Sequence, residues 1–149
     1  MRRVALFSLL LGLSLVASPA LADADAIMAA ARDLCTQSAG TFSSDGAIRQ
    51  IDVTGDGAPD TVVDEAAFVC TNAASLYSGS GGSMIHVLVG DTQSDFLVQG
   101  YDTANWAGST ILLLALHGSQ CGAEGASLCF EALTWGGDRF LSVRDAPAQ

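Results

Sequence analysis

The sequence predicts an α+β fold that is mostly β. We expect one N-terminal helix packed on an antiparallel sheet of about seven short strands, in a single disulfide-bonded domain. Three observations support this prediction: a helical apolar stripe near the N-terminus, short β-branched runs separated by turn residues, and four cysteines. The sequence has no repeat with a period of about 20–50 residues, which argues against an array of structural repeats.

Residues 1–22 have the pattern of a secretory signal peptide. Two arginines follow Met1, residues 4–16 are almost entirely apolar, and Ala20-Leu21-Ala22 is a small-residue cleavage site. The apolar run is shorter than the ~20 residues that a membrane span requires, so we expect cleavage after Ala22 rather than a retained anchor. The expected product is periplasmic or secreted and has no membrane span. It would consist of a globular domain at 23–145 and a disordered tail at 146–149.

The helix is expected to begin at Asp25, which can cap it, and to end before Gly40. Alanine is frequent in this segment and favours the helical state. The spacing of the apolar residues predicts one buried face, formed by Ile27, Ala30, Ala31, Leu34 and Cys35.

Short runs rich in apolar and β-branched residues predict the strands. Residues 109–117 form the most apolar run, and we expect this strand to be central and buried on both faces. Gly136-Gly137-Asp138 predicts a final hairpin, and residues 101–108 are expected to form a polar connection. The expected strands are 47–51, 61–63, 84–89, 96–99, 109–117, 130–135 and 139–143.

The chain is strongly acidic. It has 16 acidic residues, 6 arginines and no lysine, for a formal charge of −10. Such a surface repels nucleic-acid phosphates and anionic membrane surfaces, so neither is an expected partner.

Four cysteines in an exported chain predict two disulfides, for which three pairings exist. Cys121 and Cys129 flank a glycine-containing turn and can pair locally. Cys35 and Cys70 would then connect the helix to the region after the acidic loop. The alternative, a zinc or redox site, lacks a C-x-x-C pair and nearby histidines.

Asp52-Val53-Thr54-Gly55-Asp56-Gly57-Ala58-Pro59-Asp60 is the segment with the most specific chemistry. Its oxygen-bearing side chains alternate around a glycine turn, as in loops that bind a hard cation such as Ca²⁺. Val63 stands where an EF-hand requires glutamate, and no helices are expected on either side, so the loop is not an EF-hand. The metal-free alternative is a polar turn whose carboxylates accept hydrogen bonds from backbone N–H groups.

The loop resembles the Asp-x-Asn-Gly-Asp-Gly-x-x-Asp calcium loops of FG-GAP (integrin-type propeller) repeats. Thr54 replaces the usual asparagine or aspartate, and the matching residues are Asp52, Gly55, Asp56, Gly57 and Asp60. The resemblance implies a loop between two strands that binds a structural Ca²⁺. The implied ligands are the side chains of Asp52, Thr54, Asp56 and Asp60 and the carbonyl of Ala58.

Most of the mature chain resembles a group of small exported bacterial proteins of unassigned function that carry such a loop. Residues 135–140 match their C-terminal Trp-x-Gly-x-x-Phe-like hairpin, whereas Ser78 and Ser83 stand in place of a cysteine pair. This resemblance implies a fold and no activity.

Two further groups of residues are candidates for binding or catalysis. Tyr101, Asn105 and Trp106 are interpreted as a possible binding face, although we favour the plainer interpretation that Trp106 closes the edge of the core. His86 and His117 have no acid or nucleophile beside them in the sequence, so each is expected to be a satisfied histidine of a sheet.

We therefore expect a non-enzymatic binding or structural module of the cell envelope, with a protein or glycan partner. One alternative is a small envelope hydrolase whose site is assembled only in the fold. The other is a protein inhibitor of an envelope-targeting enzyme. A pocket that joins His86 or His117 to a carboxylate would favour the hydrolase. Exposed aromatic residues around Tyr101 and Trp106 without such a pocket would favour binding or inhibition.

Overall fold

The computed structural model describes the chain except residues 1–18, 123, 125–126 and 144–149. The expected signal-peptide residues 1–18 and the expected tail at 146–149 therefore lie outside the described residues. The expected cleavage point after Ala22 lies in the first part of the helix α1 (Pro19–Gln37). Within the described residues, no helix is long and apolar enough to cross a membrane.

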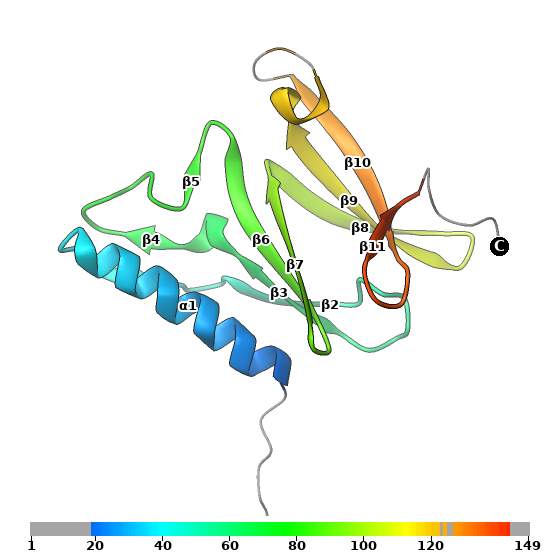
Figure 1. The fold of residues 1–149 in the computed structure, drawn as a ribbon, viewed down its shortest axis with the longest axis horizontal. Helices are drawn as coiled ribbons and strands as arrows, with labels where there is room; N and C mark the ends of the chain where they lie inside the picture. Colours follow the sequence, from blue (N-terminus) through cyan, green and yellow to red (C-terminus); the bar gives the residue numbers. More distant parts are fainter. Residues whose placement is uncertain (1–18, 123, 125–126, 144–149) are drawn as a thin grey trace, which may run out of the picture.

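The described chain is mostly β with one α-helix, and its strands pair antiparallel (Figure 1). This part of the fold prediction is confirmed. The prediction of one sheet with about seven strands is wrong, because the described residues form eleven strands in three sheets. The elements after α1 are β1 (Phe42–Ser43), β2 (Ile48–Ile51), β3 (Asp60–Asp64), η1 (Glu65–Ala67), β4 (Val69–Cys70), β5 (Ser78–Gly79), β6 (Gly82–Val89), β7 (Thr92–Val98), β8 (Gly100–Trp106), β9 (Ser109–His117), η2 (Gly118–Cys121), β10 (Leu128–Trp135) and β11 (Phe140–Ser142).

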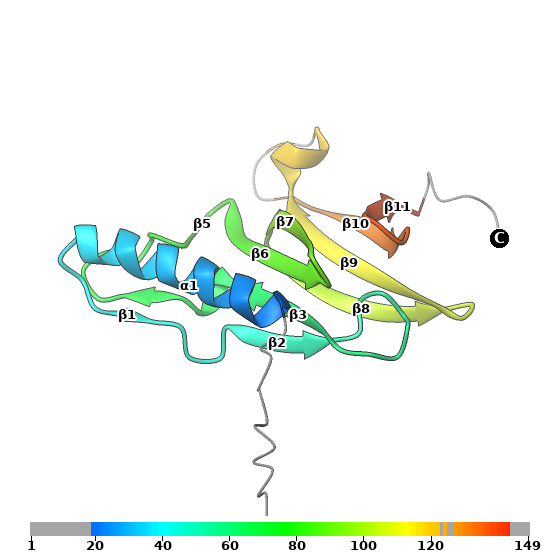
Figure 2. The same ribbon diagram turned by 60° about the horizontal axis from the view of Figure 1, so that its bottom comes forward.

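Two sheets make up most of the molecule. The first, here called the helix-side sheet, has the order β2-β3-β6-β5, and β7 also pairs with β6. The second, here called the C-terminal sheet, has the order β11-β10-β9-β8. Figure 2 shows α1 lying across the helix-side sheet, with the C-terminal sheet at the other end of the molecule. A two-stranded sheet, β1-β4, lies beside the helix.

The helix begins earlier than expected, at Pro19 rather than Asp25, and proline is well tolerated in the first turn. Its buried stripe is also displaced from the expected one. Ala24, Ala31 and Cys35 are buried, whereas Ala30 and Leu34 are exposed. The observed stripe keeps the i, i+3, i+4, i+7 spacing, but its centre is shifted toward Ala24 and Met28.

The core between α1 and the helix-side sheet contains three aromatic rings. Phe42, Phe68 and Tyr77 contact one another edge to face, with ring centroids 5.1–5.8 Å apart. The Tyr77 hydroxyl donates a hydrogen bond to the Ala31 carbonyl at 2.6 Å. The Cys35–Cys70 disulfide is buried in the same core, and Cys121–Cys129 closes a local loop, so both expected pairings are present.

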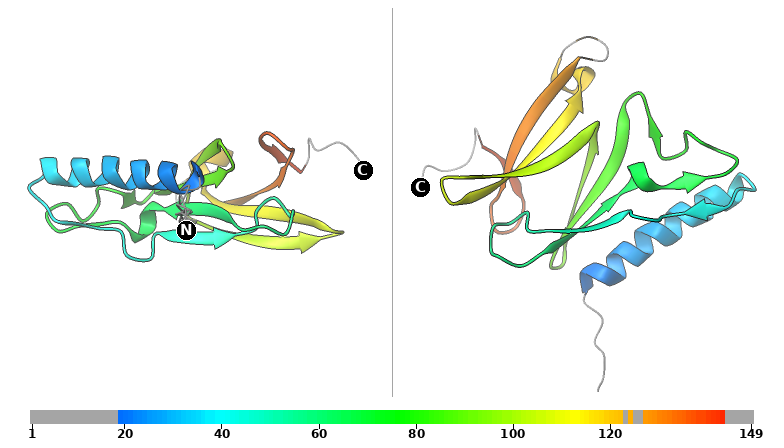
Figure 3. Two further views of the ribbon diagram at one scale, coloured as in Figure 1. Left: turned by 90° about the horizontal axis from the view of Figure 1, so that it is seen from below. Right: turned by 180° about the vertical axis from the view of Figure 1, so that it is seen from behind.

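A second core fills the space between the two large sheets. Val62 and Val87 face it from the helix-side sheet, and Leu112 and Leu114 face it from β9. The β9 strand was expected to be buried on both faces, but this expectation is wrong. Its even-numbered residues from 110 to 116 are buried, and its odd-numbered residues are only partly buried. No other helix or strand of the described residues packs on the outer face of the C-terminal sheet (Figure 3).

The chain passes from one large sheet to the other at Gln99, between β7 and β8. Ala115 is the register partner of Gly100, and its carbonyl also accepts a hydrogen bond from the Gln99 N–H at 2.7 Å. Gln99 and Gly100 thus face one residue of β9, as in a β-bulge. Residues 101–108 were expected to be a polar connection, which is wrong because 100–106 form an edge strand. Polar residues are tolerated there because an edge strand has a solvent-facing side.

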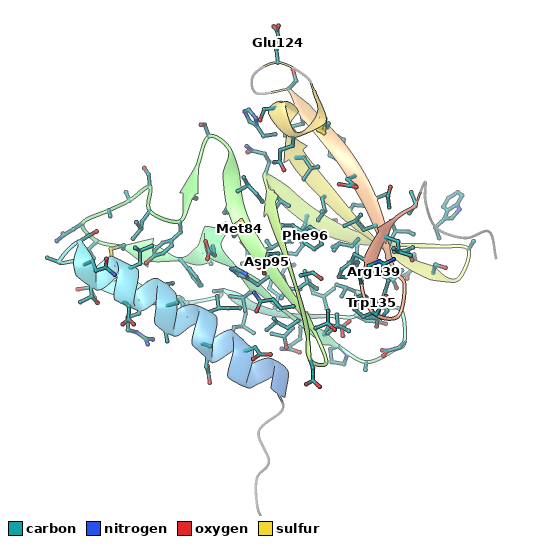
Figure 4. The ribbon with its side chains drawn as sticks, in the orientation of Figure 1. Met84, Asp95, Phe96, Glu124, Trp135 and Arg139 are labelled. Atoms are coloured by element: carbon teal, nitrogen blue, oxygen red, sulfur yellow. A yellow bond between two sulfur atoms is a disulfide. The ribbon has the colours of Figure 1, made fainter. Side chains whose placement is uncertain are left out.

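The C-terminal hairpin is confirmed and packs back on the helix-side sheet. Phe140 contacts both Trp135 and Phe96, with ring centroids 5.1 and 5.8 Å apart. Phe96 and Trp135 are labelled in Figure 4. These rings join β7 to the β10–β11 hairpin at the margin of the core between the sheets.

The crossing from β7 to β8 at Gln99 requires a glycine at position 82 of β6. Its φ of +111° is in the region that favours glycine, and a Cβ there would overlap the Val98 carbonyl. We expect Gly82→Ala to lower the free energy of unfolding by more than ~1 kcal/mol in urea unfolding. Gly79→Ala is the matched control, since a Cβ at that position meets nothing within 4 Å. Equal stability of the two variants would contradict this account of the crossing.

Candidate functional site

The acidic loop lies between β2 and β3, which pair from Ile48↔Val63 to Ile51↔Asp60. Gly55 and Gly57 have φ values of +81° and +87°, which side-chain-bearing residues rarely adopt. Val53 is fully buried between the sheets and anchors the loop to the core. The loop also lies against β9, since a Cβ at Gly55 would be 3.0 Å from the Thr110 hydroxyl oxygen.

The three loop carboxylates accept hydrogen bonds from backbone N–H groups of the loop. Asp52 Oδ1 accepts from Gly55 at 2.6 Å, and its Oδ2 accepts from Gly57 at 3.0 Å. Asp56 Oδ1 accepts from Ala58 at 2.7 Å, and Asp60 Oδ2 accepts from Val53 at 3.0 Å. These bonds hold the turn in the way expected for aspartates in loops.

The pKa values of two loop aspartates shift in opposite directions. Desolvation raises the pKa of Asp52, but hydrogen bonds from Gly55, Gly57 and Thr54 outweigh it, so the net pKa is below its usual value. Desolvation raises the pKa of Asp60, the nearby Asp56 charge raises it further, and the bonds from Val53 and Thr54 only partly compensate. A cation near Asp60 would relieve this cost of its charged form.

The loop groups expected as metal ligands differ in how many backbone hydrogen bonds they already accept. Within the described residues, no group of three or more His, Cys, Asp or Glu side chains is placed to hold a metal ion. Asp52 uses both carboxylate oxygens for backbone N–H groups. Asp56 and Asp60 each keep one carboxylate oxygen that accepts no backbone hydrogen bond from the described residues. These two oxygens, with Thr54 and the Ala58 carbonyl, are the groups left for a cation in this loop conformation.

The expected binding-face residues all lie on β8 but not on one face. Tyr101 and Trp106 occupy odd and even positions of the strand, so their side chains point to opposite faces. Tyr101 is partly buried, and the Arg49 guanidinium lies over its ring at 5.4 Å. Asn105 accepts a hydrogen bond from Thr110 at 3.2 Å. Trp106 is 77% exposed, so the favoured expectation that it closes the core edge is wrong.

His86 lies between two carboxylates that are distant in sequence. Its Nδ1 is 2.8 Å from Asp95 Oδ1, and its Nε2 is 3.1 Å from Glu65 Oε1. Asp95 faces it from the neighbouring strand β7, where it is the register partner of His86, and is labelled in Figure 4. The hydrogen bond from His86 to Glu65 raises the pKa of His86, burial opposes this, and Asp95 raises it further, for a net increase.

A cavity of about 310 Å³ adjoins this histidine. It lies beside α1, and its lining includes Ile27, Leu34, Leu76, Tyr77, Glu65 and His86. The sequence did not indicate this arrangement, because Glu65 and Asp95 are 21 and 9 residues away from His86 in the chain. The structure therefore contains a pocket that joins His86 to a carboxylate, the arrangement expected for the hydrolase alternative.

The outer face of the C-terminal sheet carries Trp106, a residue of the expected binding face, together with exposed apolar residues that the sequence did not indicate. Trp106 is 77% exposed, Phe130 69%, Leu128 55% and Val143 42%. Their strand pairing places Trp106, Leu128 and Phe130 on this face, and Ile111, Leu113 and Ala115 lie between them on β9. Residues 109–117 gave no signal for this face, because apolar residues stand at both odd and even positions of β9.

No family model, no curated protein and no solved structure matches this chain.

A pH-dependent contribution to stability follows from the His86 cluster. A folded-state pKa above the unfolded value of about 6.5 means that the contribution is complete below that pH and is lost as the pH rises through the folded pKa. The difference in unfolding free energy between wild type and His86→Gln should therefore be larger at about pH 6 than at about pH 9. Urea unfolding at the two pH values measures it.

His117→Gln is the control for this experiment, since the His117 ring is bonded to the Ser119 hydroxyl at 2.8 Å. The His86→Gln difference is compared with that of His117→Gln at the same two pH values. A His86→Gln difference that is the same at both values would exclude a charged imidazolium between the two acids.

Proposed function

We propose that this chain is an exported, non-enzymatic binding module that presents the outer face of the C-terminal sheet to a protein partner. The exposure of large apolar side chains on that face is the observation that supports this function. An antiparallel sheet with one face on a core commonly carries polar residues on its other face. Here the outer face carries leucine, isoleucine, phenylalanine and tryptophan beside polar residues such as Asp102. Contiguous exposed apolar surface of this kind marks interaction sites in stable proteins.

A protein partner fits this face better than a glycan. Sugars bind through aromatic stacking and a dense set of polar groups, whereas Leu113, Ala115 and Leu128 are aliphatic. A protein hot spot commonly combines an aromatic anchor such as Trp106 or Phe130 with surrounding apolar contacts. An inhibitor of an envelope-targeting enzyme would be one form of this function.

The hydrolase alternative has one supporting observation, the cavity lined by His86 and Glu65. Both ring nitrogens face carboxylates, so neither is free to accept a proton from a substrate. The hydroxyl lining this cavity, that of Tyr77, donates to the Ala31 carbonyl. We therefore assign His86 a structural role that connects β6, β7 and η1.

The acidic loop has a separate role in this proposal. A Ca²⁺ ion bound by Asp56, Asp60, Thr54 and the Ala58 carbonyl, with Asp52 reoriented toward it, would stiffen the β2–β3 hairpin. The support is the resemblance to FG-GAP loops together with the two carboxylate oxygens that accept no backbone hydrogen bond. The ion would perform no chemistry.

The binding surface can be tested by site-specific photo-crosslinking in cells of the source species. A benzoylphenylalanine at position 130 should give one discrete protein adduct, and an added Trp106→Ser substitution should reduce its yield by ~10-fold, as for a hot-spot residue. Mass spectrometry identifies the adduct. The control position is Leu97, which is 42% exposed on the helix-side sheet. The same pattern from both positions, or no adduct at position 130, would contradict the proposed surface.

The calcium proposal predicts a Ca²⁺-dependent rise in melting temperature. Extracellular sites commonly have Kd values of ~10⁻⁴–10⁻³ M, so millimolar Ca²⁺ relative to EDTA should raise it by a few degrees. Asp56→Ala should abolish the rise, whereas Asp91→Ala, in the exposed β6–β7 turn, should keep it. The readout is the difference in melting temperature between Ca²⁺ and EDTA. The absolute melting temperature is not used, because Asp56 also accepts a hydrogen bond from the Ala58 N–H and its loss can destabilise the loop without any ion. A rise that persists in Asp56→Ala would remove the loop as the site.

A further inference from the structure

The outer face of the C-terminal sheet contains a hollow of about 300 Å³. Gly100, Ala115 and Phe130 are paired across β8, β9 and β10, so the first two leave space beside the phenylalanine ring. Asp102 and Leu113 form the next row of the same face and also line the hollow. The hollow is therefore an apolar pocket with a carboxylate at one side.

Asp102 is placed to interact with a ligand. The Thr103 N–H donates to its Oδ1 at 2.8 Å, which fixes the carboxylate on the edge strand. Within the described residues no other hydrogen bond reaches this carboxylate. Among the same residues, no arginine forms an ion pair with Asp102. Arg49 lies over the ring of Tyr101, which also lines the hollow, Arg32 lies over Phe42, and Arg139 is at Asp138. The negative charge of the pocket is thus left for a partner.

We propose that this hollow receives a lysine or arginine side chain from a cationic, apolar segment of a protein partner. This inference rests on the proposed binding function of the same face. The aliphatic stem would lie along Leu113 and the Phe130 ring, and the charged end would reach Asp102, since long cationic side chains cover apolar surface with their stems. A cation beside a phenylalanine face is also favourable. The apolar residues of the segment would contact Trp106 and Leu128.

Charge complementarity favours a cationic protein segment over anionic lipid, nucleic acid or a second copy of this chain as the occupant of the hollow. The chain has a formal charge of −10 and no lysine, so it attracts basic partners and repels anionic lipid and nucleic acid. A second copy of the chain would bring another acidic surface. A two-fold symmetric contact through this face would also enclose two copies of Asp102 in an apolar interface without a partner charge.

The test measures fluorescence anisotropy with the labelled hexapeptide Leu-Leu-Lys-Lys-Leu-Leu. In an extended conformation, each side of this peptide presents a lysine between two leucines. Its glutamate counterpart, Leu-Leu-Glu-Glu-Leu-Leu, is the control peptide. We expect the lysine peptide to bind at least ~10-fold more tightly, and Gly100→Val to weaken it by ~10-fold because valine fills the hollow. A Cβ at Gly100 meets nothing within 4 Å, so this variant should fold.

Two matched control variants distinguish binding in the hollow from non-specific attraction to the acidic surface. Asp102→Asn should weaken binding by ~3–5-fold, as expected for a solvent-exposed ion pair, whereas Asp91→Asn removes the same charge elsewhere and should have little effect. Gly79→Val adds the same side chain on the other sheet, where a Cβ also meets nothing. Equal effects of Asp102→Asn and Asp91→Asn, or no effect of Gly100→Val, would overturn the proposal. A partner crosslinked at position 130 combined with no preference for the lysine peptide would leave the binding function standing and remove only the cationic partner.

Discussion

The structure depends on the burial of apolar residues between the two large sheets. Val62 and Val87 on one side, and Leu112 and Leu114 on the other, are almost completely removed from water. Each sheet has an apolar face that is unstable in water, and packing the two together removes both faces from solvent at once. The chain connects the two sheets by crossing from β7 to β8 at Gln99. Next to this crossing, Gly82 of β6 lies close to the Val98 carbonyl at the end of β7, where a side chain would not fit.

The single helix explains why one sheet face remains exposed. The helix-side sheet is covered on both sides, by α1 and by the C-terminal sheet. The C-terminal sheet is covered on one side only, because the described chain has no second α-helix to pack on it. A sheet in this position normally becomes polar on its free face. The C-terminal sheet keeps large apolar residues on its free face, which is the basis for proposing a partner.

The charged groups contribute in two different ways. The loop carboxylates and the acids around His86 are used internally, where they accept hydrogen bonds that fix local backbone and side-chain positions. Most of the other acids are exposed and contribute the overall negative field. Asp102 is distinct because, although exposed, it lines a mostly apolar hollow and has no ion-pair partner among the described residues.

The sequence by itself determined the elements whose signals are local. The β2–β3 turn follows from the glycines and aspartates of residues 52–60, the last hairpin from Gly136-Gly137-Asp138, and the Cys121–Cys129 pair from proximity. The strand β8 and the division into three sheets were not predicted correctly, because they depend on packing that overrides weak local propensity.

Only the tertiary structure decided the candidate sites. The three groups of the His86 cluster come from three elements, and the hollow at Gly100 exists only when β8, β9 and β10 are in register. Periodicity in residues 109–117 shows apolar residues at both odd and even positions, so it cannot tell which set faces a core. The helix-side sheet makes that choice, since it covers Leu112 and Leu114 and leaves Leu113 and Ala115 on the outer face. A contact between such distant segments has no local sequence signal.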